Sequence, residues 1–114
     1  MIKYSGAGDL PLIVKKDNIT TLKSEGLLLG FSKDSEYTDC EVQMNSGDEV
    51  ILLTDGIIES RGPDGNMFGH EGLTSVLSSI PSEINSIETI KTDFTKYVNN
   101  KYEDDVSLIV LKKL

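Results

Sequence analysis

The stretch GDEVILLTDG, residues 47–56, joins an apolar strand pattern to a carboxylate at the strand's end, and the rest of the expected fold is arranged around it. Residues 50–53 are aliphatic without alternation, which predicts a strand buried on both faces. Asp55 comes just after this strand and directly before Gly56. Its carboxylate would therefore be held rigidly beside open backbone. A carboxylate in that position can ligate a metal, and an Asp-Gly pair can equally form a turn with no chemistry. The stretch by itself leaves both interpretations open.

Length and composition indicate one soluble globular domain over residues 1–114. Hydrophobic residues make up 38% and charged residues 26% of the sequence, which is ordinary for such a domain. No apolar run approaches the roughly 20 residues that cross a bilayer, and residues 1–6 lack a signal-peptide core. The single cysteine, Cys40, cannot form an internal disulfide. We therefore expect a cytoplasmic protein in which Cys40 fills the core.

The charge balance narrows the range of partners. The net charge is −8, with 19 acidic and 11 basic residues. Nucleic-acid binding is not expected, because phosphate contacts need a basic face and the sequence has no Lys/Arg cluster. An acidic chain suits divalent cations or a basic patch on a partner. The alternative is that the excess acid only keeps the protein soluble.

The first half of the chain has strand patterns separated by turn residues. These patterns predict strands over residues 2–5, 10–14, 19–23, 37–44 and 50–53. Residues 12–22 read as a hairpin. Residues 26–31 are apolar and bounded by glycines, which predicts a buried bend.

Two helices and a final strand follow. The spacing of apolar residues predicts one helix over residues 70–80. A second helix is expected to be N-capped by Ser82, to carry Ile84 on its apolar face and to end at Asn99. Residues 106–111 predict the last strand. Strands grouped before helices, with one strand after them, indicate an α+β fold with a mostly antiparallel sheet.

Acidic residues stand at the ends of two predicted strands. Asp55 follows one strand, and Asp104 and Asp105 directly precede another. If the two strands are antiparallel neighbours, these carboxylates meet at one sheet edge, and their repulsion must be offset by protonation or a cation. Oxygen-only ligands favour Mg²⁺ or Mn²⁺. The alternative is that Asp104 and Asp105 form a solvated strand cap.

Three motifs in order carry a resemblance to a known family. Residues 47–59 follow the pattern Gly-Asp-x₅-Thr-Asp-Gly-[aliphatic]₂-Glu, Phe68-Gly69 comes next, and residues 104–107 are Asp-Asp-Val-Ser. Together they resemble the metal-dependent, PP2C-type serine/threonine protein phosphatases, and most closely the branch of sporulation stage II protein E and the sigma-regulator phosphatases. Residues 6–12 are similar to that branch's Asn-Ala-Gly-His-Pro-Pro segment, from which Ser5-Gly6 and Asp9 depart.

The resemblance implies part of a phosphatase β-sandwich flanked by helices, with a Mn²⁺ or Mg²⁺ pair between the sheets. It implies that Asp55 and Asp104 are metal ligands and that Asp105 supports them. Gly56 would be the small residue that leaves room at the site. The family's first metal-binding motifs lie upstream of anything in this sequence. We therefore expect the C-terminal part of a phosphatase domain, with an incomplete binuclear site and little or no activity alone.

The implied reaction is hydrolysis of phosphoserine or phosphothreonine by a metal-activated water, in regulatory signalling such as sporulation. The implied substrate is a phosphoprotein of the anti-sigma-factor-antagonist type, and no side chain is assigned as a catalytic residue. One alternative is a non-catalytic remnant that acts as a binding or self-association module. It would form a homodimer through the sheet face that a half-sandwich leaves exposed. Another is a small acidic cation-binding module that only shares the Asp-Gly turns.

Overall fold

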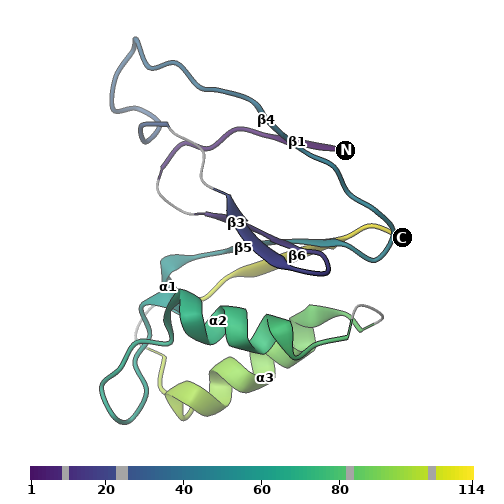
Figure 1. Cartoon of the computed structure of the whole chain (residues 1–114). Helices are drawn as coiled ribbons and strands as arrows, with labels where there is room; N and C mark the ends of the chain where they lie inside the picture. Colours follow the sequence, from purple (N-terminus) through teal and green to yellow (C-terminus); the bar gives the residue numbers. More distant parts are fainter. Residues whose placement is uncertain (9–10, 23–25, 82–83, 103–104) are drawn as a thin grey trace.

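The computed structural model describes residues 1–8, 11–22, 26–81, 84–102 and 105–114, which form three layers (Figure 1). A two-stranded sheet lies on one face of a four-stranded sheet, and helices cover the other face. In chain order the elements are β1 (Ile2–Tyr4), β2 (Leu12–Lys15), β3 (Ile19–Leu22), β4 (Cys40–Val42), β5 (Glu49–Leu53), α1 (Asp55–Ile58), α2 (Gly69–Ser78), α3 (Ser86–Val98) and β6 (Leu108–Lys112).

The predicted α+β fold with antiparallel strands is confirmed. The larger sheet has the order β3-β2-β5-β6, and β1 pairs with β4 in the smaller one. Every pairing of these strands is antiparallel, including the hairpin that β2 and β3 form through Leu12↔Leu22. β5 lies between β2 and β6, with Val50 opposite Val14 on one side and Ile51 opposite Val110 on the other. The aliphatic run at residues 50–53 thus lies in an inner strand of the larger sheet.

Alternate residues of β5 enter two separate cores. Ile51 and Leu53 face the helices, where both are buried. Val50 faces the small sheet and is 1% exposed. Burying one such aliphatic side chain stabilises the fold by roughly 1.5–3 kcal/mol. The helices contribute apolar faces as their spacing predicts, namely Leu73 and Leu77 of α2 and Ile90, Phe94 and Val98 of α3.

The helices differ from the sequence prediction mainly at the start of α3 and in the presence of α1. α3 begins at Ser86, and its N-cap is Asn85, whose side chain accepts a hydrogen bond from the Ile87 N–H at 2.9 Å. The predicted cap, Ser82, lies outside the described residues. Ile84 is 51% exposed, because it precedes the helix. The short helix α1 is absent from the prediction, since four residues are too few for a periodic pattern. No helix within the described ranges is long and apolar enough to cross a membrane.

The prediction of a buried bend over residues 26–31 is wrong. Leu27, Leu28, Leu29 and Phe31 are 51–79% exposed. Glycine-bounded apolar residues occur in buried bends and in loops alike, and none of the described elements packs over this loop. The strand predicted over residues 37–44 shortens to β4, where Cys40 is half-buried opposite Tyr4. Desolvation raises the pKa of Tyr4, and a side-chain hydrogen bond with Cys40 adds to that rise.

A buried polar cluster ties β2, β5 and α3 together. Glu49 is 0% exposed, and its Oε1 lies 3.4 Å from Lys15 Nζ. The Ser86 hydroxyl donates to Glu49 Oε1 at 2.6 Å, and the Ser86 N–H donates to Oε2 at 3.3 Å. Breaking a buried ion pair by removing one partner is costly, because the remaining charge stays desolvated. Glu49 therefore fixes where α3 begins against the sheet.

Lys15→Met should lower the free energy of unfolding by about 3 kcal/mol, because it leaves the buried Glu49 carboxylate without its cation. Lys15→Met combined with Glu49→Gln should cost less than Lys15→Met alone, since the glutamine amide is neutral. Urea unfolding of the wild type, Lys15→Met, Glu49→Gln and the double variant measures these changes. Lys16→Met is the matched control, because the Lys16 side chain is 38% exposed and its ion pair is worth at most about 1 kcal/mol. Simple additivity in the double variant would contradict the charge argument.

Candidate metal centre

The pairing of β5 with β6 brings the two predicted acidic segments to one edge of the sheet. The last pair of the ladder is Leu53↔Leu108, so the residues after β5 lie beside those before β6. One further backbone hydrogen bond extends the contact, from the Thr54 N–H to the Ser107 carbonyl at 3.1 Å. Asp55 and Asp105 therefore come from the same end of the two neighbouring strands.

The Thr54 hydroxyl fastens the two segments together. It accepts a hydrogen bond from the Ser107 N–H at 2.9 Å and donates one to the Asp105 carbonyl at 3.4 Å. Sequence reasoning did not assign this role to Thr54. The signal was present, because Thr54 and Ser107 are the polar neighbours of the carboxylates in the two motifs. Only the register of β5 and β6 shows that they face each other.

Asp55 is the first residue of α1 and is exposed. The backbone of α1 is held by the Glu59 N–H, which donates to the Asp55 carbonyl at 2.8 Å, and by the Ser60 hydroxyl, which donates to the Gly56 carbonyl. Within the described part of the chain, the Asp55 carboxylate makes no hydrogen bond or ion pair with another residue.

Gly56 is the point of closest approach between α1 and the segment before β6. A Cβ added at Gly56 would overlap the Asp105 carbonyl oxygen. Any other residue would thus push Asp55 and Asp105 apart. Packing against the Asp105 carbonyl therefore explains why position 56 is a glycine, independently of the role that the resemblance assigns to it.

The type of donor atom at this edge fits a hard divalent cation, but the described donors are too few to complete its coordination shell. Asp55 and Asp105 supply carboxylate oxygens, and both residues are exposed. Asp104 lies outside the described residues. Among those that the structure describes, there is no group of three or more His, Cys, Asp or Glu side chains that could hold a metal. Magnesium demands near-octahedral coordination by oxygen, so two carboxylates form only part of such a site.

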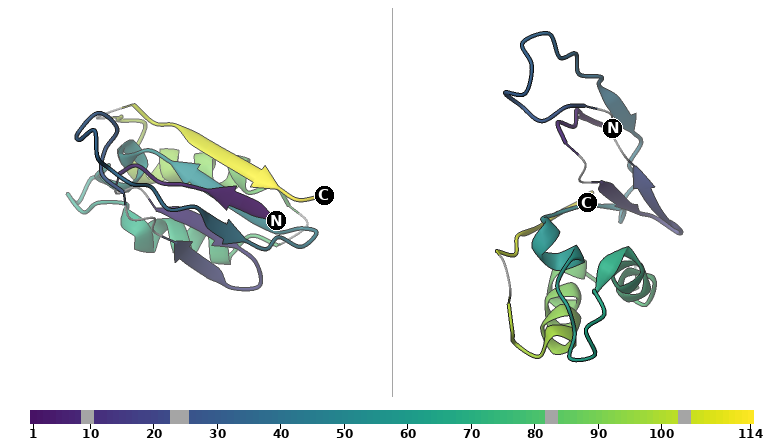
Figure 2. Two further views of the ribbon diagram at one scale, coloured as in Figure 1. Left: turned by 90° about the horizontal axis from the view of Figure 1, so that it is seen from above. Right: turned by 90° about the vertical axis from the view of Figure 1, so that its left-hand side faces the viewer.

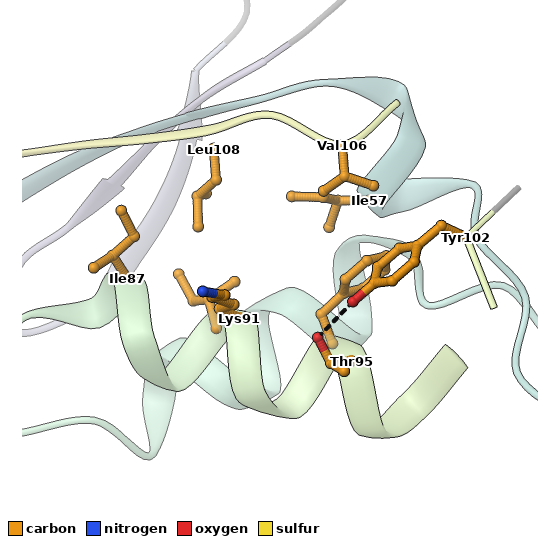
Figure 3. A pocket seen from close by; sticks show the side chains of 9 residues that line it. Ile57, Ile87, Lys91, Thr95, Tyr102, Val106 and Leu108 are labelled. Atoms are coloured by element: carbon orange, nitrogen blue, oxygen red, sulfur yellow. Dashed lines mark hydrogen bonds between the residues drawn. The ribbon is translucent and has the colours of Figure 1, made fainter. Parts of the chain in front are cut away.

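A separate, apolar pocket of about 330 Å³ lies between α3 and the segment that leads into β6 (Figure 3). Ile57 of α1, Val106 and Leu108 line one side, and the hydrogen-bonded hydroxyls of Thr95 and Tyr102, 2.9 Å apart, stand on another. Its largely hydrocarbon lining is unsuited to a cation. Neither Asp55 nor Asp105 lines this pocket.

Thr54→Val should lower the free energy of unfolding by about 1–2 kcal/mol, because it removes the hydroxyl that bonds to Ser107 and Asp105 while keeping the side chain's shape. Thr54→Ser keeps the hydroxyl and should retain most of the stability. Urea unfolding, with amide exchange at Ser107, measures both. An equal loss in the two variants would show that the hydroxyl has no special role.

Gly56→Ala should destabilise the fold by about 1–3 kcal/mol, since its methyl group must displace the Asp105 carbonyl. Faster amide exchange at Ser107 should accompany the loss. Glu59→Ala, at an exposed position of the same turn, is the control and should change stability by less than about 0.5 kcal/mol. An unchanged unfolding midpoint for Gly56→Ala would mean that the two segments do not pack as described.

Sequence comparison relates the chain to a family of bacterial phosphatases. The family model described as Stage II sporulation protein E (SpoIIE) matches residues 1–114. Phosphoserine phosphatase RsbU of Bacillus subtilis is 29% identical over 115 residues, which are 96% of this chain and 34% of RsbU. The chain therefore spans about a third of the length of that relative.

Two solved structures of Bacillus subtilis SpoIIE are similar in fold. One contains the PP2C phosphatase domain and a fragment of the regulatory domain. It gives a TM-score of 0.75 at 21% identity, over 96% of this chain and 34% of that chain. The other is the phosphatase domain presoaked with manganese, with a TM-score of 0.69 at 19% identity, over 97% of this chain and 50% of that chain. Because the family model matches the whole sequence, the chain belongs to the SpoIIE family, and its fold is that of part of a PP2C-type phosphatase domain.

Proposed function

We propose that this chain is the C-terminal part of a metal-dependent phosphatase that hydrolyses phosphoserine or phosphothreonine in proteins. The observation that carries the proposal is the meeting of residues 54–56 with residues 105–107 at one edge of the sheet. These are the residues of the two family motifs that contain acidic side chains. Membership of the SpoIIE family supports a phosphatase role for that edge.

The proposed site holds Mn²⁺ or Mg²⁺. Asp55 and Asp104 would be ligands, with Asp105 and the small Gly56 supporting them. A bound cation supplies the positive charge that activates a water and neutralises a phosphate. Thr54 holds the two segments in register, so the spacing of the carboxylates does not depend on the cation alone. The manganese presoak of the similar SpoIIE phosphatase domain favours Mn²⁺ as the first ion to test.

The proposed substrate is a phosphoprotein in a regulatory pathway of the cytoplasm, such as an anti-sigma factor antagonist. RsbU, which is named a phosphoserine phosphatase, supports phosphoserine as the first substrate to test. With a net charge of −8, the chain repels a bare anionic phosphate. A phosphoprotein with basic residues around the modified serine would therefore be preferred over a free phosphate ester.

A second candidate is a non-catalytic binding module. The observation in its favour is that only Asp55 and Asp105 among the described residues stand at the candidate centre. Weak or absent metal binding by the isolated chain would agree with it.

Asp55→Asn should weaken Mn²⁺ binding by at least about 10-fold, because it removes a charged oxygen ligand. Calorimetric titration of the 114-residue chain with MnCl₂ measures the affinity. Asp17→Asn is the matched control, because Asp17 is exposed in the turn between β2 and β3, at the opposite end of the sheet. Equal affinities for the two variants would remove Asp55 from the site.

A further inference from the structure

The apolar pocket between α3 and the segment that leads into β6 changes character from its inside to its mouth. We call it the α3 pocket. Its volume of about 330 Å³ is near the lower end of the range of roughly 300–1,000 Å³ that small-molecule sites occupy. Its inner wall is hydrocarbon, because Ile57, Ile90 and Phe94 are 1%, 0% and 3% exposed. Tyr102 and Val106, which also line it, are exposed. The pocket is therefore apolar inside and bordered by water at its mouth.

Separate pieces of the chain form this pocket (Figure 2). The right-hand view shows α1 between the larger sheet and α3, with the segment that enters β6 beside α1. Ile57 comes from α1, and Val106 comes from that segment. On α3 the lining residues Ile87, Lys91 and Thr95 follow one another at a spacing of four residues, so they form one stripe of the helix. A ligand in the pocket would contact all three pieces at once.

The α3 pocket has a cation at its mouth. Among the described residues that line it, Lys91 alone has a charged side chain. Lys91 is exposed, and its ammonium makes no hydrogen bond or ion pair within the described ranges. Figure 3 shows its side chain between those of Ile87 and Thr95. A lysine covers apolar surface with its stem while its ammonium stays in water. The Lys91 ammonium can therefore pair with an anion whose apolar part lies inside the pocket.

A pair of hydroxyls offers the same ligand a hydrogen bond. Thr95 Oγ1 and Tyr102 Oη lie 2.9 Å apart and are hydrogen-bonded (Figure 3). In such a pair one hydroxyl donates to the other, and the hydrogen of the second hydroxyl is left to donate elsewhere. Thr95 is one helical turn from Lys91, so one head group can reach both the ammonium and the hydroxyl pair.

We propose that the α3 pocket binds a small carboxylate with an apolar body, such as a medium-chain fatty-acid anion. The hydrocarbon part would lie against the buried inner wall. The carboxylate would pair with Lys91 and accept a hydrogen bond from the Thr95–Tyr102 pair. A single ammonium balances one negative charge, so a monoanion suits this mouth better than a phosphate dianion.

The overall charge of the chain does not prevent such binding. The net charge of −8 repels anions at long range. In about 0.1 M salt, charges on the surface more than about 10 Å apart are largely screened from each other. The ammonium of Lys91 at the mouth therefore decides which head group is preferred.

This site is distinct from the candidate metal centre and does not rest on the proposed function. Its walls are nevertheless close to that centre in sequence. Ile57 lies two residues after Asp55, and Val106 directly follows Asp105. A ligand that bridges these walls to α3 would restrain both acidic segments. Binding should therefore slow amide exchange at Ser107, whose N–H donates to the Thr54 hydroxyl.

NMR titration of the 114-residue chain with sodium octanoate, without metal, tests the site. We expect saturable 1:1 binding with a Kd of about 1 mM or tighter. The largest shifts should be at the amides of Ile57, Lys91, Thr95 and Val106. Hexanoate should bind roughly 10-fold more weakly, because it buries two fewer methylene groups. Octylamine has the same chain and a positive charge, so it should bind at least about 10-fold more weakly than octanoate.

Lys91→Met removes the charge and keeps an apolar stem. It should weaken octanoate binding by at least about fivefold and abolish the preference over octylamine. Lys96→Met is the matched control, because Lys96 is exposed on the same helix and does not line the pocket. It should change the affinity by less than about twofold. Removing both hydroxyls, by Thr95→Val with Tyr102→Phe, should weaken binding by about threefold.

Each outcome bears on the proposal. Circular dichroism first establishes that the variants fold, which the exposure of Lys91 and Lys96 favours. No saturable shifts with octanoate, or shifts confined to residues outside the pocket, would overturn the site. Octylamine binding as tight as that of octanoate, or equal affinities for Lys91→Met and Lys96→Met, would overturn the carboxylate as its ligand. Octanoate binding by a chain that takes up no Mn²⁺ would support the pocket and count only against the metal centre.

Discussion

The antiparallel pairing of β5 with β6 is the constraint on which the rest of this structure depends. These strands belong to parts of the sequence that are more than 50 residues apart, and their register fixes which residues meet at each end of the sheet. At one end the register places Glu49 opposite Lys112. At the other it places Leu53 opposite Leu108, so that Thr54 reaches Ser107. A shift of one residue would turn every side chain of β6 to the other face and would separate the acidic motifs.

The two ends of β5 carry acidic residues in opposite environments. Glu49 is buried, and its charge is met by Lys15 and by the start of α3. Asp55 is exposed and makes no such contact with the described residues. A buried and paired carboxylate stabilises the fold. Two exposed acidic segments side by side repel each other, and a cation between them can offset that repulsion. Glu49 at one end of β5 thus has a structural role, and Asp55 at the other end has the proposed metal-binding role.

Much of this fold follows from local patterns. The hairpin of β2 and β3, the apolar faces of α2 and α3 and the central strand have regular periodicity, which the sequence displays directly. The exposed loop at Leu27–Phe31 could not be predicted, because an apolar run does not reveal whether anything covers it. The Thr54 hydroxyl bonds and the fit of Gly56 against Asp105 depend on strand register, which no short window contains. The residues of the candidate site and the meeting of its two segments at one sheet edge could therefore be predicted, whereas the contacts that hold the segments together could not.

The Thr54–Ser107 hydrogen bond also bears on how the chain folds. It joins residues 53 positions apart, so forming it closes a loop that contains all three helices. Closing a loop of that length costs conformational entropy before the stabilising contacts between β5 and β6 form. Long-range pairing of this kind therefore slows folding. The helical segment can become ordered locally before β6 reaches β5. The acidic edge should accordingly be among the last parts to form during refolding, and a trapped intermediate would have helices without the paired segments 54–56 and 105–107.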